Sequence, residues 1–184
     1  MDNEELKTSR TAWLEKMAAT YTGDGINPEG KLAASNSKSK ALALAARCWQ
    51  CVGGNDDSKP VDRIRNCPNN QCAIFPHRPY QDGGYTANLA ARKDSAPTIP
   101  PNTVVSPIER ALANPASRPL AIRAYCYDCM GGQPKGCANS NGNVRQFIGE
   151  CRSTQCALWD VRPWQNTTTD DDTENQAEAE IAEG

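Results

Sequence analysis

The chain has 184 residues, nine of them cysteine, and a formal net charge of −2. Leu, Ile, Val and Phe together supply 25 residues, which is below the roughly one-fifth share that a conventional apolar core requires. No window approaches the ~18 consecutive apolar residues of a transmembrane helix. The composition therefore excludes a membrane protein of that kind and indicates that cysteines replace part of the core.

The N-terminal segment, residues 1–39, is expected to consist of a helix and a linker, and it starts with acidic residues where a secretory signal has bases. We therefore expect a cytoplasmic protein, whose cysteines bind metal more often than they form disulfides. Residues 4–21 are predicted to form an amphipathic helix that packs on the protein itself or captures a partner. Its apolar side chains recur at helical spacing: Leu6, Trp13, Leu14, Met17 and Tyr21.

Residues 40–80 form the first cysteine-rich module. "KALALAAR" at 40–47 is rich in helix formers and leads into a Cys-x-x-Cys followed by Gly-Gly at 53 and 54. "KPVDRIR" at 59–65 predicts a short helix with proline in its first turn. A Cys-x4-Cys and "AIFPHRPY" then close the module.

The segment from 81 to 117 is punctuated by Gly and Pro, which indicates a linker. Within it, "SPIERALA" predicts one short helix, because Ser106 and Glu109 have the spacing of a capping box and Pro107 suits the first turn. The two modules are thus expected to be separate units on a partly stiff connector.

Residues 118–164 repeat the first module. A shift of 78 places "LALAARCWQCVGG" on "LAIRAYCYDCMGG", and a shift of 84 places "IRNCPNNQCAIFPHRPY" on "IGECRSTQCALWDVRPW". The second copy has six more residues between its cysteine pairs. "NVRQFIGE" at 143–150 matches the second short helix of the first copy.

The duplication indicates which residues matter. His77 faces Val161 in the other copy, and Cys137 lies in the longer spacer, so neither is expected to be a ligand. Eight cysteines recur in both copies: Cys48, Cys51, Cys67, Cys72, Cys126, Cys129, Cys151 and Cys156.

Two cysteine pairs within about 40 residues are typical of a four-thiolate zinc site, in which the ion joins segments that cannot fold alone. We therefore predict a small, metal-stabilised, mainly α protein with irregular loops, made of two tandem modules that each hold one Zn²⁺. Disulfides and iron–sulfur clusters are the alternatives. A miniature core is expected beside the metals, formed by Ile64, Phe75, Ile148 and Trp159.

Each module ends in Arg-Pro and an aromatic residue, Arg78 with Tyr80 and Arg162 with Trp164. These residues are candidates for nucleic-acid binding, because an arginine can hold a phosphate while a ring stacks on a base. They have an equally simple structural role, in which the ring covers the metal site and the guanidinium caps a helix carbonyl.

The C-terminal segment, residues 165–184, contains seven acidic residues and no basic one, which predicts a disordered tail. Each module carries six bases and three acids. A zinc ion with four thiolates contributes about −2, so the charge of each loaded module is weakly positive.

At "AIRAYCYDCMGG" and "CALWDVRPW" the sequence resembles a loose group of small cysteine-rich proteins that are encoded by bacteriophages and other mobile elements. "CWQCVGG" and "CAIFPHRPY" match the same pattern, so the resemblance covers 40–80 and 118–164. It implies zinc binding and a phage or mobile-element origin.

Three classes of function follow from these observations. The first is binding of nucleic acid or a nucleoprotein complex, and the second is an adaptor or inhibitor that docks on a host or phage protein. An enzyme or a binder of a small-molecule substrate is not expected, because the sequence has one histidine, no HExxH and no phosphate loop, and four thiolates leave zinc no open position.

Overall fold

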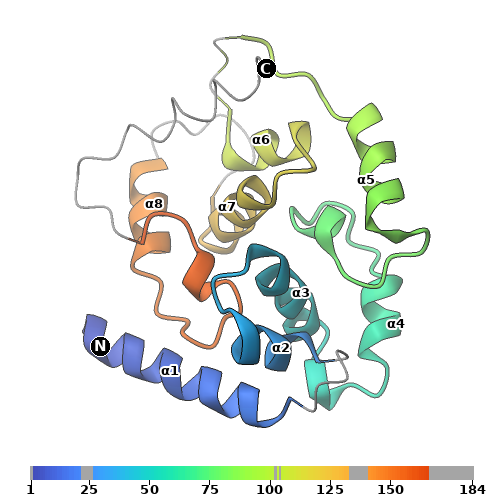
Figure 1. The fold of residues 1–184 in the computed structure, drawn as a ribbon. Coiled ribbons are helices and arrows are strands. Elements are labelled where there is room, and N and C mark those ends of the chain that lie inside the picture. Colours follow the sequence, from blue (N-terminus) through green and yellow to red (C-terminus); the bar gives the residue numbers. More distant parts are fainter. Residues whose placement is uncertain (1, 22–26, 102, 104, 133–140, 166–184) are drawn as a thin grey trace.

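The computed structural model describes residues 2–21, 27–101, 103, 105–132 and 141–165 and is mainly helical (Figure 1). Helices α1 to α4 cover Asn3–Ala19, Pro28–Ser35, Lys40–Cys51 and Pro60–Arg65. Helices α5 to α8 cover Gly84–Asp94, Pro107–Ala113, Arg118–Cys129 and Asn141–Gly149. Three 3₁₀ turns, η1 to η3, cover Gly54–Asp56, Phe75–His77 and Trp159–Val161. The described ranges contain no strand.

The helices begin where local capping predicts. The capping box at Ser106 and Glu109 is present in both directions, which confirms the short helix predicted in the linker. Ser39 and Ser117 cap α3 and α7 by accepting from the backbone N–H three residues later. These two serines are separated by the 78-residue shift of the repeat, so the duplication begins earlier than the cysteine pattern suggests.

Two helices lie in segments that the sequence assigned to linkers. Asn27 caps α2 through its side chain, and Pro28 occupies the first turn. Helix α5 starts at Gly84 although Gly83 and Gly84 both adopt positive φ, 76° and 80°. Its interior, "YTANLAARKD", is rich in helix formers, but the glycines before it directed the prediction to a loop.

The two modules share one core. Helices α3 and α7 lie side by side at the centre of the molecule (Figure 1). The buried cluster takes side chains from both modules and from α2: Leu32, Ala43, Leu44, Ala46, Ile74, Ala121, Ile122, Ala157 and Leu158. The expectation of two separate units on a connector is therefore wrong, because the apolar faces of α3 and α7 bury each other.

Equivalent positions of the repeat meet in this core. Leu44 and Ile122 are related by the 78-residue shift, and Ile74 and Leu158 by the 84-residue shift. Arg47 and Tyr125 are also equivalent, and the Arg47 Nε donates to the Tyr125 hydroxyl at 2.9 Å. Contact between equivalent positions is the pattern of an isologous interface, and the Arg47–Tyr125 bond follows that pattern.

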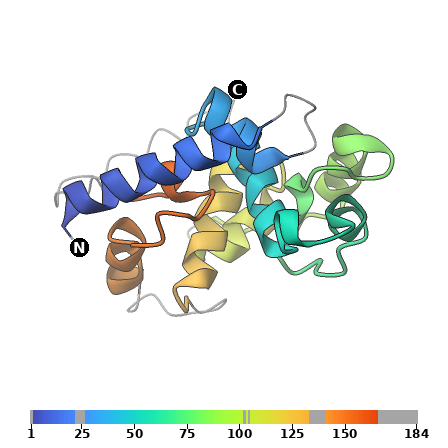
Figure 2. The same ribbon diagram turned by 90° about the horizontal axis from the view of Figure 1, so that it is seen from below.

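Helix α1 crosses one side of the molecule and contacts α2 (Figure 2). Its Arg10 side chain is buried and forms an ion pair with Asp160 of the second module at 2.7 Å. The guanidinium also lies 4.4 Å from the ring of Trp13, which is buried too. The amphipathic helix thus packs on the protein itself. No helix in the described ranges is long and apolar enough to cross a membrane.

Candidate metal centres

The first cysteine pair of each module lies in the last turn of a central helix. Cys48 and Cys51 end α3, and Cys126 and Cys129 end α7. A spacing of three residues puts both side chains of a pair on one face of the helix. The chain then turns away through Gly53 and Gly131, whose φ values are 92° and 77°.

The second glycine of each Gly-Gly has a packing role. A Cβ on Gly54 would meet the Trp49 ring at 3.0 Å, and one on Gly132 would overlap the Tyr127 ring. Trp49 and Tyr127 are equivalent residues within the two Cys-x-x-Cys motifs, and both are buried. The close approach that the structure requires is to an aromatic ring.

The second cysteine pair flanks an irregular loop between a helix and a 3₁₀ turn. Cys67 follows α4 with its N–H bonded to the Ile64 carbonyl at 3.3 Å, and Cys151 follows α8 with the same bond to Ile148 at 3.2 Å. The Cys72 and Cys156 carbonyls then accept the first N–H of η2 and η3. The two modules therefore build their second pair with the same backbone bonds.

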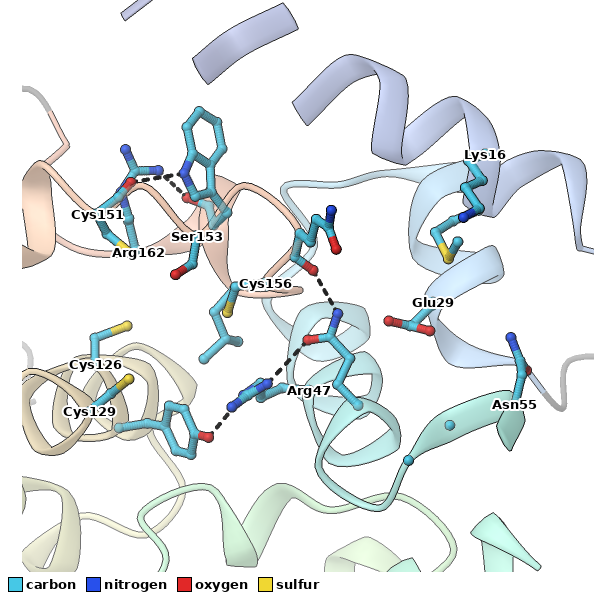
Figure 3. A pocket seen from close by; sticks show the side chains of 18 of the residues that line it. Lys16, Glu29, Arg47, Asn55, Cys126, Cys129, Cys151, Ser153, Cys156 and Arg162 are labelled. Carbon is cyan, nitrogen blue, oxygen red and sulfur yellow. Dashed lines mark hydrogen bonds between the residues drawn. The ribbon is translucent and has the colours of Figure 1, made fainter. Parts of the chain in front are cut away.

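Four thiols line one cavity in each module. The first module's cysteines surround a cavity of about 70 Å³ together with Tyr125 of the second module. The second module's cysteines lie at one end of a cavity of about 720 Å³ that extends to α1, α2 and α3 (Figure 3). The expected miniature core is present beside them, since Ile64 and Ile148 are each 1% exposed and line these cavities with Phe75 and Trp159.

The thiols of each module influence one another's ionisation. Burial, followed by the neighbouring charges of Cys72, Cys51 and Cys67, raises the pKa of Cys48 to about 12. Cys126 has the same pattern. Burial, followed by the neighbouring charges of Cys156, Cys129 and Cys151, raises the pKa of Cys126 to about 12. All eight repeated cysteines are free thiols in the structure.

The cavities contain sulfur donors, the ligand type that soft divalent ions prefer, but the sulfurs are not arranged around one point. Among the described residues, no three His, Cys, Asp or Glu side chains stand close enough together to hold a metal, so the sulfurs share a cavity without sharing a coordination point. Thiols attract one another weakly and thiolates repel, so drawing four sulfurs together requires a cation between them. Four thiolates are the ligands of structural zinc.

The arginines predicted as binding residues turn inward. Arg78 Nη1 donates to the Phe75 carbonyl at 3.1 Å, with its guanidinium 3.8 Å from the Phe75 ring. Arg162 makes the same bond to Trp159 and stacks at 4.1 Å. Both arginines line the thiol cavities of their own modules. This geometry matches the structural alternative, in which the arginine caps a carbonyl beside the site.

Each inward arginine carries one buried donor without an acceptor. The Nε atoms of Arg78 and Arg162 are the equivalent atoms of the two repeats, and both lack a hydrogen-bond partner in the described structure. Arg78 opposes the rise in the pKa of Cys48, and Arg162 does the same for Cys126. A guanidinium therefore stands within electrostatic range of each set of thiols.

The aromatic residues predicted to stack on bases are part of the fold. Tyr80 and Trp164 are half-buried and adopt positive φ, 63° and 59°, a backbone conformation that is unfavourable for residues with a side chain. Trp164 packs with the buried Tyr127 and Ile148. The four residues predicted for nucleic-acid binding thus pack within their own modules and do not form one exposed surface.

Sequence reasoning missed the glutamine that follows each aromatic residue. Gln81 Nε2 donates to the carbonyls of Pro76 and Arg78, and Gln165 Nε2 donates to those of Asp160 and Arg162. In both copies the glutamine therefore links the backbone of the 3₁₀ turn to the arginine that follows it. The 84-residue shift continues through them, and this signal was sufficient to find them.

His77, which the repeat did not select as a ligand, is not among the residues that line either thiol cavity. Its Nδ1 is 3.0 Å from the Tyr85 hydroxyl. Cys137 and residues 166–184 of the acidic tail lie outside the described residues, so their predicted roles stay predictions. No family model, curated protein or solved structure matches the chain.

Proposed function

We propose that the protein binds two zinc ions, one in each set of four cysteines, and that these ions stabilise the helical fold. The observation that carries the proposal is the repeated cavity of four free thiols with a half-buried arginine beside it. Soft thiolate sulfur favours zinc, and four protein ligands are typical of a structural site. The ion would supply the link between each central helix and the loop that follows α4 or α8.

The arginines beside the cavities, Arg78 and Arg162, support a charged site of this kind. Four thiolates around one zinc ion carry a net charge of about −2. A guanidinium in contact with the cavity reduces the energy of burying that charge, and the unpartnered Nε–H of Arg78 and of Arg162 suits a thiolate acceptor. Neutral thiols accept hydrogen bonds only weakly, so they would leave both Nε–H donors without a strong acceptor.

Elemental analysis of the reduced, purified full-length protein tests the proposal. We expect about two zinc ions per chain, and about one in Cys48→Ser or Cys126→Ser, because each substitution removes one ligand of one site. Cys137→Ser is the matched control and should retain both ions. Iron with acid-labile sulfide would show the iron–sulfur alternative, whereas no bound metal, with a circular dichroism spectrum unchanged by chelators, would overturn the proposal.

The zinc sites are proposed to serve binding and not catalysis. Four thiolates leave zinc no position for a substrate or water. The single histidine of the chain contacts the Tyr85 hydroxyl and is not among the residues that line either thiol cavity. We therefore propose that the protein is not an enzyme and that it acts by binding a partner through its surface.

Nucleic acid, alone or within a nucleoprotein complex, is the binding partner that we propose first. An open groove of about 500 Å³ lies between the starts of α3 and α7 and is lined by Lys38, Lys40 and Arg118. All three side chains are exposed, and the groove lies between equivalent positions of the two modules. Basic side chains along a groove contact the phosphate backbone without reading sequence.

A gel-shift assay over a range of salt concentrations tests this partner. Binding should weaken steeply as salt rises, and reversal of Lys38, Lys40 and Arg118 to Glu should abolish it, whereas reversal of the exposed Lys7 on α1 should not. A chain that ends at Gln165 should bind more tightly, because the acidic tail competes with phosphate for the same groove.

The alternative partner is a host or phage protein on which the chain docks as an adaptor or inhibitor. If no DNA or RNA binds at low salt and a specific protein is recovered in a pull-down, this alternative replaces the first. If charge reversal of the groove residues does not change how much of that protein is recovered, the protein contacts another part of the surface.

A further inference from the structure

A chain of polar side chains crosses the boundary between the modules. It runs from Tyr125 to Arg47 at 2.9 Å and from Arg47 Nη1 to Gln50 Oε1 at 3.4 Å (Figure 3). Arg47 and Gln50 belong to α3 of the first module, and Tyr125 belongs to α7 of the second. The chain therefore joins the two helices that carry the Cys-x-x-Cys motifs.

Gln50 extends this chain to a cysteine of the other site. Its Nε2 donates to the Gln155 carbonyl at 2.7 Å, and its Oε1 accepts from the Ala157 N–H at 3.0 Å. These two residues flank Cys156, so one side chain holds the backbone on both sides of that cysteine. Gln50 itself lies between Cys48 and Cys51 of the first site.

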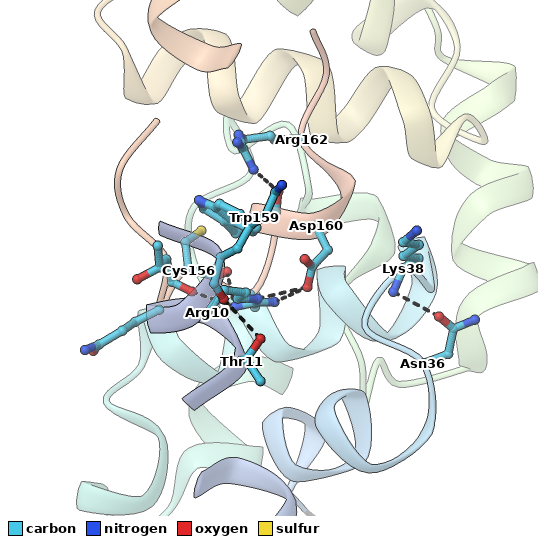
Figure 4. Close-up of polar contacts among 12 residues, drawn as sticks. Arg10, Thr11, Asn36, Lys38, Cys156, Trp159, Asp160 and Arg162 are labelled. Atoms are coloured by element: carbon cyan, nitrogen blue, oxygen red, sulfur yellow. Dashed lines mark hydrogen bonds and ion pairs between the residues drawn. The ribbon is translucent and has the colours of Figure 1, made fainter. Parts of the chain in front are cut away.

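A second side chain from outside the module holds the same backbone. Arg10 of α1 donates to the Cys156 carbonyl at 3.0 Å and to the Thr154 carbonyl at 2.8 Å (Figure 4). Cys156 is thus positioned by α1 and α3, neither of which belongs to its own module. The arrangement of the second site depends on the packing of the first module.

Each site also takes part of its wall from the other module. Tyr125 lines the cavity of the first set of thiols, and Arg47 lines the cavity of the second. Arg47 lowers the pKa of Cys156 that burial raises. Arg47 and Tyr125 are equivalent residues of the two modules, and each lines the thiol cavity of the other module.

We propose that the two sites bind metal with positive cooperativity and that Gln50 is the positioning residue that transmits the coupling. The proposal rests on the zinc-binding function above. An ion bound by Cys48 and Cys51 fixes the end of α3 and with it the Gln50 side chain. Gln50 then holds Cys156 in place, so the second ion orders fewer groups when it binds. By linkage, an ion at the second site strengthens the first by the same factor.

Simple electrostatics predicts the opposite sign. Two loaded sites of charge about −2 repel each other, which would make the second ion bind more weakly than the first. Measured positive cooperativity would therefore assign the coupling to the hydrogen-bonded contact and not to charge.

Native mass spectrometry of the reduced full-length protein during a zinc titration measures the coupling. For two equal sites, tenfold coupling lowers the singly loaded fraction at half saturation from about one half to about one quarter. Gln50→Ala should return this fraction to about one half. Asp128→Ala is the matched control, because Asp128 occupies the same repeat position, is exposed, and should leave the distribution as in the wild type.

A cobalt titration of the second site alone gives an independent measurement. In Cys67→Ser, we expect the remaining site to bind Co²⁺ about tenfold more weakly than the same site in the wild type, and Gln50→Ala should remove this difference. Two ions that bind with no change on Gln50→Ala would overturn the coupling while the zinc function stands. A wild-type chain that binds neither metal would overturn the zinc function itself.

Discussion

A shared core predicts that one substitution in the first module destabilises both modules. Leu44 is 1% exposed and belongs to the buried cluster that also contains Ile122 and Leu158 of the second module. Leu44→Ala should reduce the free energy of unfolding by about 3 kcal/mol, from the lost transfer energy and the cavity that remains. For a chain of this length, that change lowers the melting temperature by about 6–12 °C.

Thermal unfolding of the reduced, metal-loaded protein tests this prediction with two probes. Circular dichroism reports all helices, and tryptophan fluorescence reports residues in both modules. The two transitions should coincide in the wild type and in Leu44→Ala, because the modules unfold together. Ile122→Ala should have a similar effect, and Leu112→Ala, at a side chain that is 48% exposed, should have little. The reasoning is refuted if Leu44→Ala splits the transition and one part melts at the wild-type temperature.

Three further predictions concern individual side chains. Burial, followed by the charge of Arg118, lowers the pKa of His77 to about 4. As pH falls, the imidazole of His77 is therefore protonated in the unfolded chain before it is protonated in the folded one. The free energy of unfolding should fall by up to about 3 kcal/mol as pH drops from about 6.5 to about 4. Equilibrium unfolding of His77→Gln should lack this pH-dependent loss. Gly132→Ala should destabilise the protein by more than about 2 kcal/mol in urea unfolding, because the added methyl group overlaps the Tyr127 ring; a neutral effect would contradict that contact. Arg10→Ala should cost about 3 kcal/mol in the same assay, since it leaves buried carbonyls without a donor and Asp160 without its partner. Lys7→Ala, on an exposed part of the same helix, is its control and should change little.

The repeat alone determined much of the candidate sites. It selected eight of nine cysteines, and the structure places each set of four around one cavity. It did not select His77 as a ligand, and that remains a prediction; in the structure the His77 Nδ1 contacts the Tyr85 hydroxyl. Helix formers and caps predicted the helices that carry or precede the cysteines. These features depend on residues close in sequence, whose preferences act before any tertiary contact forms.

The tertiary structure decided how the two copies face each other. The sequence places the apolar residues Leu44 and Ile122 in equivalent, repeated segments but could not show that they share a core, because an apolar helix face can pack against any matching face. The inward turn of Arg78 and the contact of Gln50 with the backbone at Cys156 depend on residues far apart in the chain. Local preferences specify the cysteine-bearing segments, whereas the free energy of packing between distant segments determines which site each side chain serves.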